Sequence, residues 1–153
     1  MKLTFAAAFA LAATAAPAWA QVSVTQPWVR GTVQGQKATG AFMELRSTED
    51  AALVGAESPV AGVVEIHEMR MEGNVMSMRA IPKLELPAGK AVELKPGGYH
   101  VMLMDLKQPM KKGDSVPIRL KVQGGDGKVR EVEVKAEVRE LSAPAPKGGA
   151  MKH

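Results

Sequence analysis

The fold is decided by an alternating stretch near the end of the chain, SVPIRLKVQGGDGKVREVEVKAEV at residues 115–138. Apolar and polar residues alternate on both sides of the Gly-Gly-Asp-Gly segment at 124–127. Alternation with a period of two is typical of β-strands that bury one face. A glycine-rich segment between two such runs is typical of a hairpin. The stretch therefore predicts two antiparallel strands joined by a tight turn.

The same kind of pattern continues toward the N-terminus, and no long stretch has the periodicity of a helix. Turn signals occur at Gly73-Asn74, 87–89 and 96–98. Many short strands with frequent turns favour an all-β fold, an antiparallel sandwich or barrel. We expect strands at 22–32, 38–47, 51–57, 63–71, 75–81, 90–94, 99–106, 115–123 and 128–140.

Both ends of the chain differ in composition from this β region. Residues 1–20 combine Lys2, an apolar run and an Ala-Trp-Ala site, which is the pattern of a secretory signal peptide. The run is shorter than the roughly 20 residues that span a bilayer, and the chain has no cysteine to carry a lipid. We therefore expect cleavage after Ala20, no stable membrane insertion afterwards and, in a bacterium, a periplasmic protein. A β domain at 21–141 would precede a flexible Pro-, Gly- and Ala-rich tail at 142–153.

Charge and cysteine content argue against several classes of protein. The formal net charge is only +4, acidic and basic residues are interspersed, and no basic cluster contains aromatic residues. This pattern does not predict nucleic-acid binding. The absence of cysteine excludes disulfides and any thiolate metal site, including a blue-copper electron-transfer centre.

Methionine and histidine gather in one window of the sequence. Residues 67–104 hold six of the ten methionines and two of the three histidines. Residues two apart on a strand share a face. The window therefore predicts three same-face groups: His67, Met69 and Met71; Met76 and Met78; and His100, Met102 and Met104.

The turn at 72–74 decides how the first two groups relate to each other. A two-residue loop at Glu72-Gly73 places His67 opposite Met78, whereas a loop at Gly73-Asn74 leaves them diagonal on the same face. A three-residue loop places them on opposite faces, because a slip of one residue reverses every side chain. Two-residue loops suit a tight hairpin, so we expect His67 and Met78 to converge.

The residue types in this window favour a soft metal ion. Thioether sulfur is a soft ligand and imidazole an intermediate one, so together they favour Cu(I). Zinc sites normally use Cys, His, Asp or Glu. Methionine is also an ordinary core residue, and single methionines can serve packing alone. We interpret Met43, Met104 and Met110 as core or surface residues, and Met69, Met71 and Met76 as at most an outer thioether shell.

The spacing of four residues resembles a family signature. His67 is followed by ten residues, Met78, twenty-one residues, His100, one residue and Met102. This is similar to the pattern H-x10-M-x21-H-x-M of the PCuAC family of periplasmic copper chaperones. The resemblance extends over about residues 22–140.

The resemblance implies a cupredoxin-like Greek-key sandwich or barrel. It also implies delivery of Cu(I) to an acceptor in cytochrome c oxidase assembly, either an oxidase subunit or a Sco-type protein. Some family members bind additional copper in a C-terminal extension. Here Met151 and His153 are the accessory candidates, and imidazole with a carboxylate would suit Cu(II) there. The implied Cu(I) ligands are His67, Met78, His100 and Met102.

Two other functions remain open at this stage. A copper storage or resistance protein would bind the same ion without a dedicated acceptor. An enzyme could use Glu65 or Glu68 with a histidine as an acid–base pair. Ser77 is the only hydroxyl close by in the sequence and no nucleophile constellation accompanies it, so we expect no enzymatic activity.

Overall fold

The computed structural model describes residues 21–140. The predicted signal peptide at 1–20 and the predicted tail at 142–153, with Met151 and His153, lie outside the described residues. Within residues 21–140 there is no helix of the length and apolarity needed to cross a membrane.

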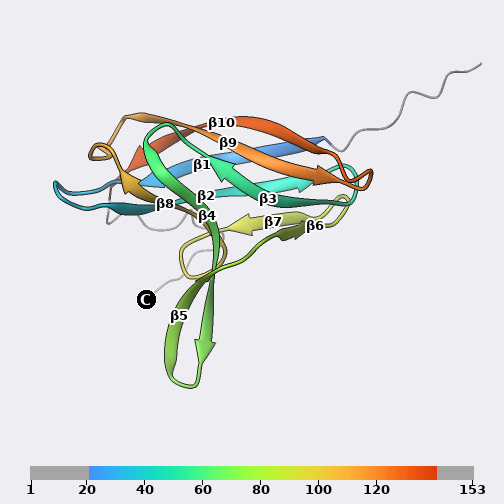
Figure 1. The fold of residues 1–153 in the computed structure, drawn as a ribbon, viewed down its shortest axis with the longest axis horizontal. Helices are drawn as coiled ribbons and strands as arrows, with labels where there is room; N and C mark the ends of the chain where they lie inside the picture. The colour runs from blue at the N-terminus through green and yellow to red at the C-terminus, as the bar shows by residue number, and fades with distance from the viewer. Residues whose placement is uncertain (1–20, 141–153) are drawn as a thin grey trace, which may run out of the picture.

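The described chain is built from strands, which confirms the all-β prediction (Figure 1). Nine of the ten strands were predicted, with bounds that differ by at most two residues. The strand that the pattern missed, β6, has only three residues, too few for alternation to be recognised. The strands are β1 (Val22–Arg30), β2 (Ala38–Ser47), β3 (Ala51–Glu57), β4 (Ala61–Glu72), β5 (Val75–Ala80), β6 (Leu84–Leu86), β7 (Ala91–Leu94), β8 (His100–Leu106), β9 (Ser115–Gly124) and β10 (Val129–Arg139).

The strands form one curled sheet in the order β5-β4-β8-β2-β1-β10-β9-β3-β6, with β7 also paired to β2. The consecutive strands β6 and β7 pair with β3 and β2, which lie far apart in this order, so the sheet closes into a cupredoxin-like sandwich. The pairing is antiparallel except between β1 and β10, which are parallel. The antiparallel sandwich expected from the sequence is therefore present, with one parallel pair whose strands are not joined by a hairpin.

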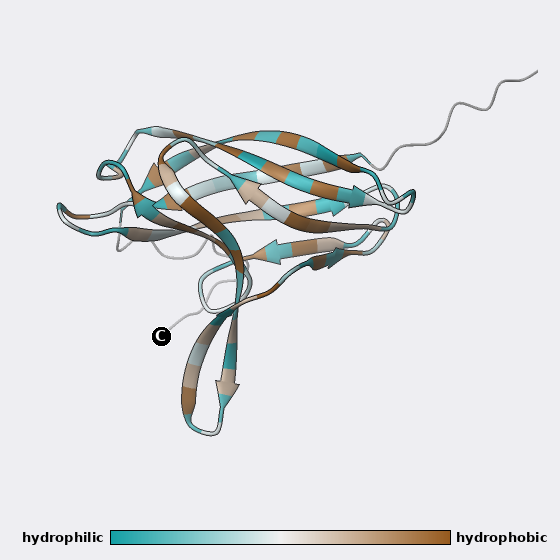
Figure 2. Cartoon of the chain, in the orientation of Figure 1, coloured by the Kyte–Doolittle hydropathy of each residue, from teal (hydrophilic) through white to brown (hydrophobic). Residues whose placement is uncertain are grey.

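The core is made of inward-facing aliphatic side chains from both layers of the sandwich. In β9 the alternation works as predicted, because Val116, Ile118, Leu120 and Val122 are all buried and the residues between them are not. Figure 2 shows the resulting alternation of hydrophobic and hydrophilic residues along β9 and β10. Full burial of such a side chain contributes about 1.5–3 kcal/mol.

The β4–β5 hairpin extends away from this body (Figure 1). Strand β4 pairs with β8 up to His67, and beyond His67 it pairs with β5 alone. Glu72 pairs with Val75, so the loop consists of Gly73 and Asn74. Gly73 has a φ of +63°, which glycine adopts readily at the first position of a type II′ hairpin turn. The hairpin thus has the two-residue turn that the sequence favours.

Candidate functional site

The candidate site lies where the protruding hairpin leaves the body of the protein. His67 is directly opposite His100 on β8 and directly opposite Ala80 on β5. Because opposite residues of an antiparallel pair project on the same side, the two histidines share a face. Their ring centroids are 5.7 Å apart.

The register of the hairpin settles which predicted arrangement of His67 and Met78 is present. Met78 lies opposite Met69, so Met78 and His67 are diagonal neighbours rather than direct partners. Both still project from the same face of the sheet. Of the predicted arrangements, the structure therefore has the diagonal one, which the Gly73-Asn74 loop produces.

His100 is held in one defined state by its surroundings. Its side chain is buried, and burial lowers its pKa, an effect that the nearby charges of His67 and Arg30 reinforce and the Gly98 carbonyl opposes. His100 is therefore neutral near pH 7. Its Nδ1 lies 3.1 Å from the Gly98 carbonyl oxygen. A carbonyl can only accept, so Nδ1–H is the donor and the free lone pair is on Nε2.

The lone pair of His100 faces a thioether. Nε2 of His100 lies 3.2 Å from the sulfur of Met78. With the proton on Nδ1, neither of these two atoms has a hydrogen to donate, and both are electron-pair donors. A soft cation bound between them would be stabilised by both atoms, because imidazole and thioether are ligands for the same ions.

His67 presents a second free lone pair. Its Nε2 donates to Oε2 of Glu65 at 2.8 Å, which leaves the lone pair of the neutral ring on Nδ1. That atom is buried and has no hydrogen-bond partner among residues 21–140. A buried polar atom without a partner is costly in a folded protein. A bound cation would satisfy it, while Glu65 fixes the ring as outer-sphere carboxylates do at metal sites.

Met102 is the fourth predicted ligand and lies on the same face. It is two residues from His100 on β8 and directly opposite Glu65 on β4, and it is partly buried. The structure therefore brings His67, His100 and Met78 together and places Met102 beside them. Met104 is also only partly buried, whereas Met43 and Met110 are core residues.

The floor of the site is aromatic, a feature that the sequence pattern did not indicate. Phe42 on β2 is buried, with its ring centroid 6.2 Å from that of His100 and 4.6 Å from that of Trp28. Two other contributors were also missed, the Gly98 carbonyl and the positioning role of Glu65. The sequence analysis named Glu65 only as a possible acid–base partner, and its positioning role could have been predicted because it lies two residues before His67 and so shares its face.

The same geometry bears on the enzyme alternative. Glu65 does pair with His67, but Glu68 lies on the opposite face of the hairpin, where its Oε1 accepts from Nε of Arg79 at 2.6 Å. Ser77 is on that opposite face too, and its hydroxyl donates to the carbonyl of Arg70. Ser77, the hydroxyl close by in the sequence, therefore does not lie beside the Glu65–His67 pair.

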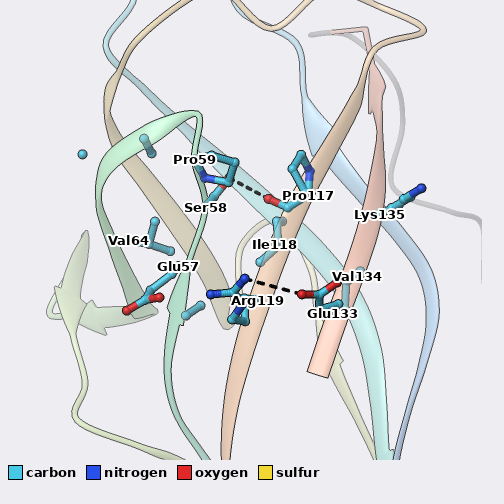
Figure 3. Close-up of a pocket in the computed structure, with 13 residues that line it drawn as sticks. Glu57, Ser58, Pro59, Val64, Pro117, Ile118, Arg119, Glu133, Val134 and Lys135 are labelled. Atoms are coloured by element: carbon cyan, nitrogen blue, oxygen red, sulfur yellow. Dashed lines mark hydrogen bonds and ion pairs between the residues drawn. The ribbon is translucent and has the colours of Figure 1, made fainter. Parts of the chain in front are cut away.

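The site does not offer the ligands that hard ions require. In the described part of the chain, no three His, Asp or Glu side chains come close enough together to hold a metal ion. A cavity of about 810 Å³ lies elsewhere, between the start of β4 and strands β3, β9 and β10 (Figure 3). Its lining includes the Ser58–Pro117 hydrogen bond and the Arg119–Glu133 ion pair, and neither histidine lines it.

Solved structures with a similar fold include the following two. The solution structure of CuI-DR1885 from Deinococcus radiodurans is 34% identical, with a TM-score of 0.56, and the match covers 83% of this chain and 81% of that one. The copper-bound PCuAC domain from PmoF2 is 22% identical, with a TM-score of 0.63, over 78% and 92% of the two chains. The second likeness concerns the fold alone.

Comparisons of sequence also find relatives, and they match the β domain. The family described as "LpqE-like: Putative lipoprotein LpqE-like" matches residues 22–138. "Putative lipoprotein Lxx21020" of Leifsonia xyli subsp. xyli is 33% identical over 117 residues, 74% of this chain and 69% of the relative. "Uncharacterized protein RP573" of Rickettsia prowazekii is 33% identical over 124 residues, 77% and 68% of the two chains. These matches, together with the shared PCuAC fold, show that the chain belongs to the LpqE-like family.

Proposed function

We propose that the protein is a periplasmic copper chaperone that binds one Cu(I) and transfers it to an acceptor protein. The ligands of the proposed site are His67, Met78, His100 and Met102. The observation that carries the proposal is the pair of imidazoles, each with a ring nitrogen that no hydrogen-bond donor satisfies, beside the thioether of Met78.

The chemistry of these ligands supports Cu(I) over other ions. All four are neutral, so they offer little to a divalent ion that prefers carboxylates or thiolates. Thioether sulfur stabilises the monovalent, soft ion. The name of the solved relative from Deinococcus radiodurans, which is described as CuI, supports the same ion.

Transfer is proposed to occur by exchange of ligands without any change of oxidation state. Met78 is 47% exposed, so a ligand of a partner protein can approach the ion from its side. Met78 would be replaced first, and the imidazoles of His100, which is buried, and His67, which is partly buried, would release the ion last. The suggested acceptor, an oxidase subunit or a Sco-type protein in cytochrome c oxidase assembly, rests on the resemblance to PCuAC proteins.

The location and the tail are part of the same proposal. A cleaved signal peptide at 1–20 would deliver the protein to the periplasm, as the pattern of those residues suggests. Met151 and His153 would form an accessory copper site, suited to Cu(II), outside the four-ligand site. A storage protein without a dedicated acceptor is the alternative function, and it would use the same ligands.

The first experiment measures binding. Anaerobic Cu(I) titration against a chromophoric chelator should show one high-affinity ion, and an equal concentration of Zn(II) should not displace it. His100→Ala should weaken binding by more than about 100-fold, beyond the range expected for loss of an outer-sphere partner. Met102→Leu should also weaken it, and Met104→Leu is the matched control on the same strand face. Unchanged affinity in His100→Ala would disprove the site.

The second experiment separates a chaperone from a storage protein. The Cu(I)-loaded protein is mixed with apo acceptor domains, one from an oxidase subunit and one of Sco type, and copper is measured on each partner after separation. A chaperone should lose its ion to an acceptor faster than it loses the ion to buffer. Equal rates of loss would favour storage.

A further inference from the structure

One face of the β4–β5 hairpin consists entirely of thioethers beyond the histidine. Met69 lies opposite Met78, and Met71 lies opposite Met76. All four project from the face that carries His67, because they are two and four residues from His67 or from Ala80, its partner on β5. The row of soft ligands therefore continues from the proposed copper site toward the hairpin tip.

Packing does not account for these methionines. Met71 is 60% exposed and Met76 is 46% exposed, whereas Met43 and Met110 in the core are almost fully buried. A flexible thioether is useful for filling irregular gaps in a core, but within residues 21–140 no second layer covers the side chains. Exposed positions on a hairpin are more commonly polar, so the choice of methionine at each of them calls for another reason.

The opposite face of the hairpin keeps this row in place. The Glu68 carboxylate accepts from Nε of Arg79 across the strands, and the Ser77 hydroxyl donates to the Arg70 carbonyl. These contacts support the same register that places Met71 opposite Met76. The polar groups face away from the thioethers, so the methionine face carries no carboxylate beyond His67.

We propose that Met71 and Met76, assisted by Met69, form a second and weaker Cu(I) site through which the ion enters and leaves the first. This inference rests on the proposed function of the four-ligand site. Opposite Cβ atoms of an antiparallel pair are about 4.5–5.5 Å apart, and the three side-chain torsions of methionine allow both sulfurs to converge on one ion. The ion moves by exchange of thioether ligands and stays Cu(I) throughout.

The position of Met78 makes this site continuous with the first one. Met78 contacts His100 on one side and is paired with Met69 on the other. The Met71–Met76 pair is one step of two residues farther out, about 7 Å along the strand. A site made of thioethers alone lacks imidazole, so it should fill only after the four-ligand site is occupied.

The test is a titration of the full chain with Ag(I), a redox-stable probe for the soft site, followed by NMR of 13C-methyl-labelled methionines. In the first equivalent, the methyl resonances of Met78 and Met102 should shift. In the second, those of Met71 and Met76 should shift. The methyl groups of Met43 and Met110, buried in the core, are internal controls that should not respond.

A paired variant tests the same point by stoichiometry. Met71→Leu with Met76→Leu should reduce the bound Ag(I) from two equivalents to one at this hairpin, while the shifts of Met78 and Met102 persist. The Met151 methyl reports separately on the tail. If the second equivalent moves Met151 and leaves Met71 and Met76 unchanged, the relay site is disproved and the proposed function stands. If the first equivalent leaves Met78 and Met102 unmoved, the proposed function itself fails.

Discussion

The β9–β10 hairpin and the β4–β5 hairpin follow the same sequence rule and have opposite outcomes. Both alternate two kinds of side chain along two strands joined by a tight turn. In β9 the apolar side chains are buried in the core, whereas in the β4–β5 hairpin Met71, Met76 and Met78 are exposed and Met69 is only partly buried. The difference arises because β9 and β10 are flanked by β3 and β1 and covered by a second layer, while β5 pairs with β4 alone.

The comparison shows that alternation identifies a face but not what covers it. The residue types on each face indicate whether that face is covered. The covered face of β9 is made of Val, Ile and Leu, which are typical of a packed sheet. The uncovered face of the outer hairpin is made of Met, whose sulfur can bind a soft ion as well as pack.

The largest expected effect is a loss of folding stability when a buried side chain of β9 is shortened. Ile118→Ala should lower the free energy of unfolding by about 2–5 kcal/mol, because the side chain is 1% exposed and its removal leaves a cavity. Urea denaturation of the copper-free protein measures this. A loss below about 1 kcal/mol would show that this face is not the core of the fold.

The next largest effect is expected on copper affinity, from a change at Glu65, where the β4–β5 hairpin leaves the body of the protein. Glu65→Gln should weaken Cu(I) binding by about 10–100-fold, because the carboxylate that orients His67 is replaced by a weaker partner. Glu68→Gln is the matched control on the opposite face, where the carboxylate binds Arg79 instead. Equal affinity in the two variants would contradict the positioning role of Glu65.

A pH effect follows from the burial of His100. Its pKa is lowered in the folded state, chiefly by burial, whereas in the unfolded chain it titrates near about pH 6.5. Below that pH the unfolded state binds more protons, so the stability of the copper-free protein should fall as pH drops through this region. His100→Gln should show a shallower fall than the original protein when urea denaturation is repeated across the range.

The smallest effect is expected in the exposed hairpin. Met76→Ala should change the free energy of unfolding by less than about 0.5 kcal/mol, since the side chain has no core to leave. The same urea measurement that detects the loss in Ile118→Ala serves here. A loss comparable to that of Ile118→Ala would mean that the methionine face is packed, and the contrast between the two hairpins would disappear.

Much of the fold could be predicted from local pattern. Alternation and glycine-containing turns identified nine of the ten strands, because a strand with one buried face repeats every two residues. Strand β6 was missed because it has only three residues. The parallel β1–β10 pair was missed because no hairpin or crossover signal links strands at opposite ends of a chain. The candidate ligands His67, Met78, His100 and Met102 came instead from their long spacings, through the resemblance to the PCuAC pattern.

By itself, the sequence determined the strands and their faces, because these depend on residues close together, and its residue types suggested soft candidate ligands. The tertiary structure alone decided that His67 is opposite His100, that Met78 is diagonal to His67, and that the hairpin face is uncovered. It also decided which nitrogen of each histidine is free, through Glu65 and the Gly98 carbonyl. The physical reason is that register, burial and hydrogen-bond partners depend on neighbouring strands that are distant in sequence.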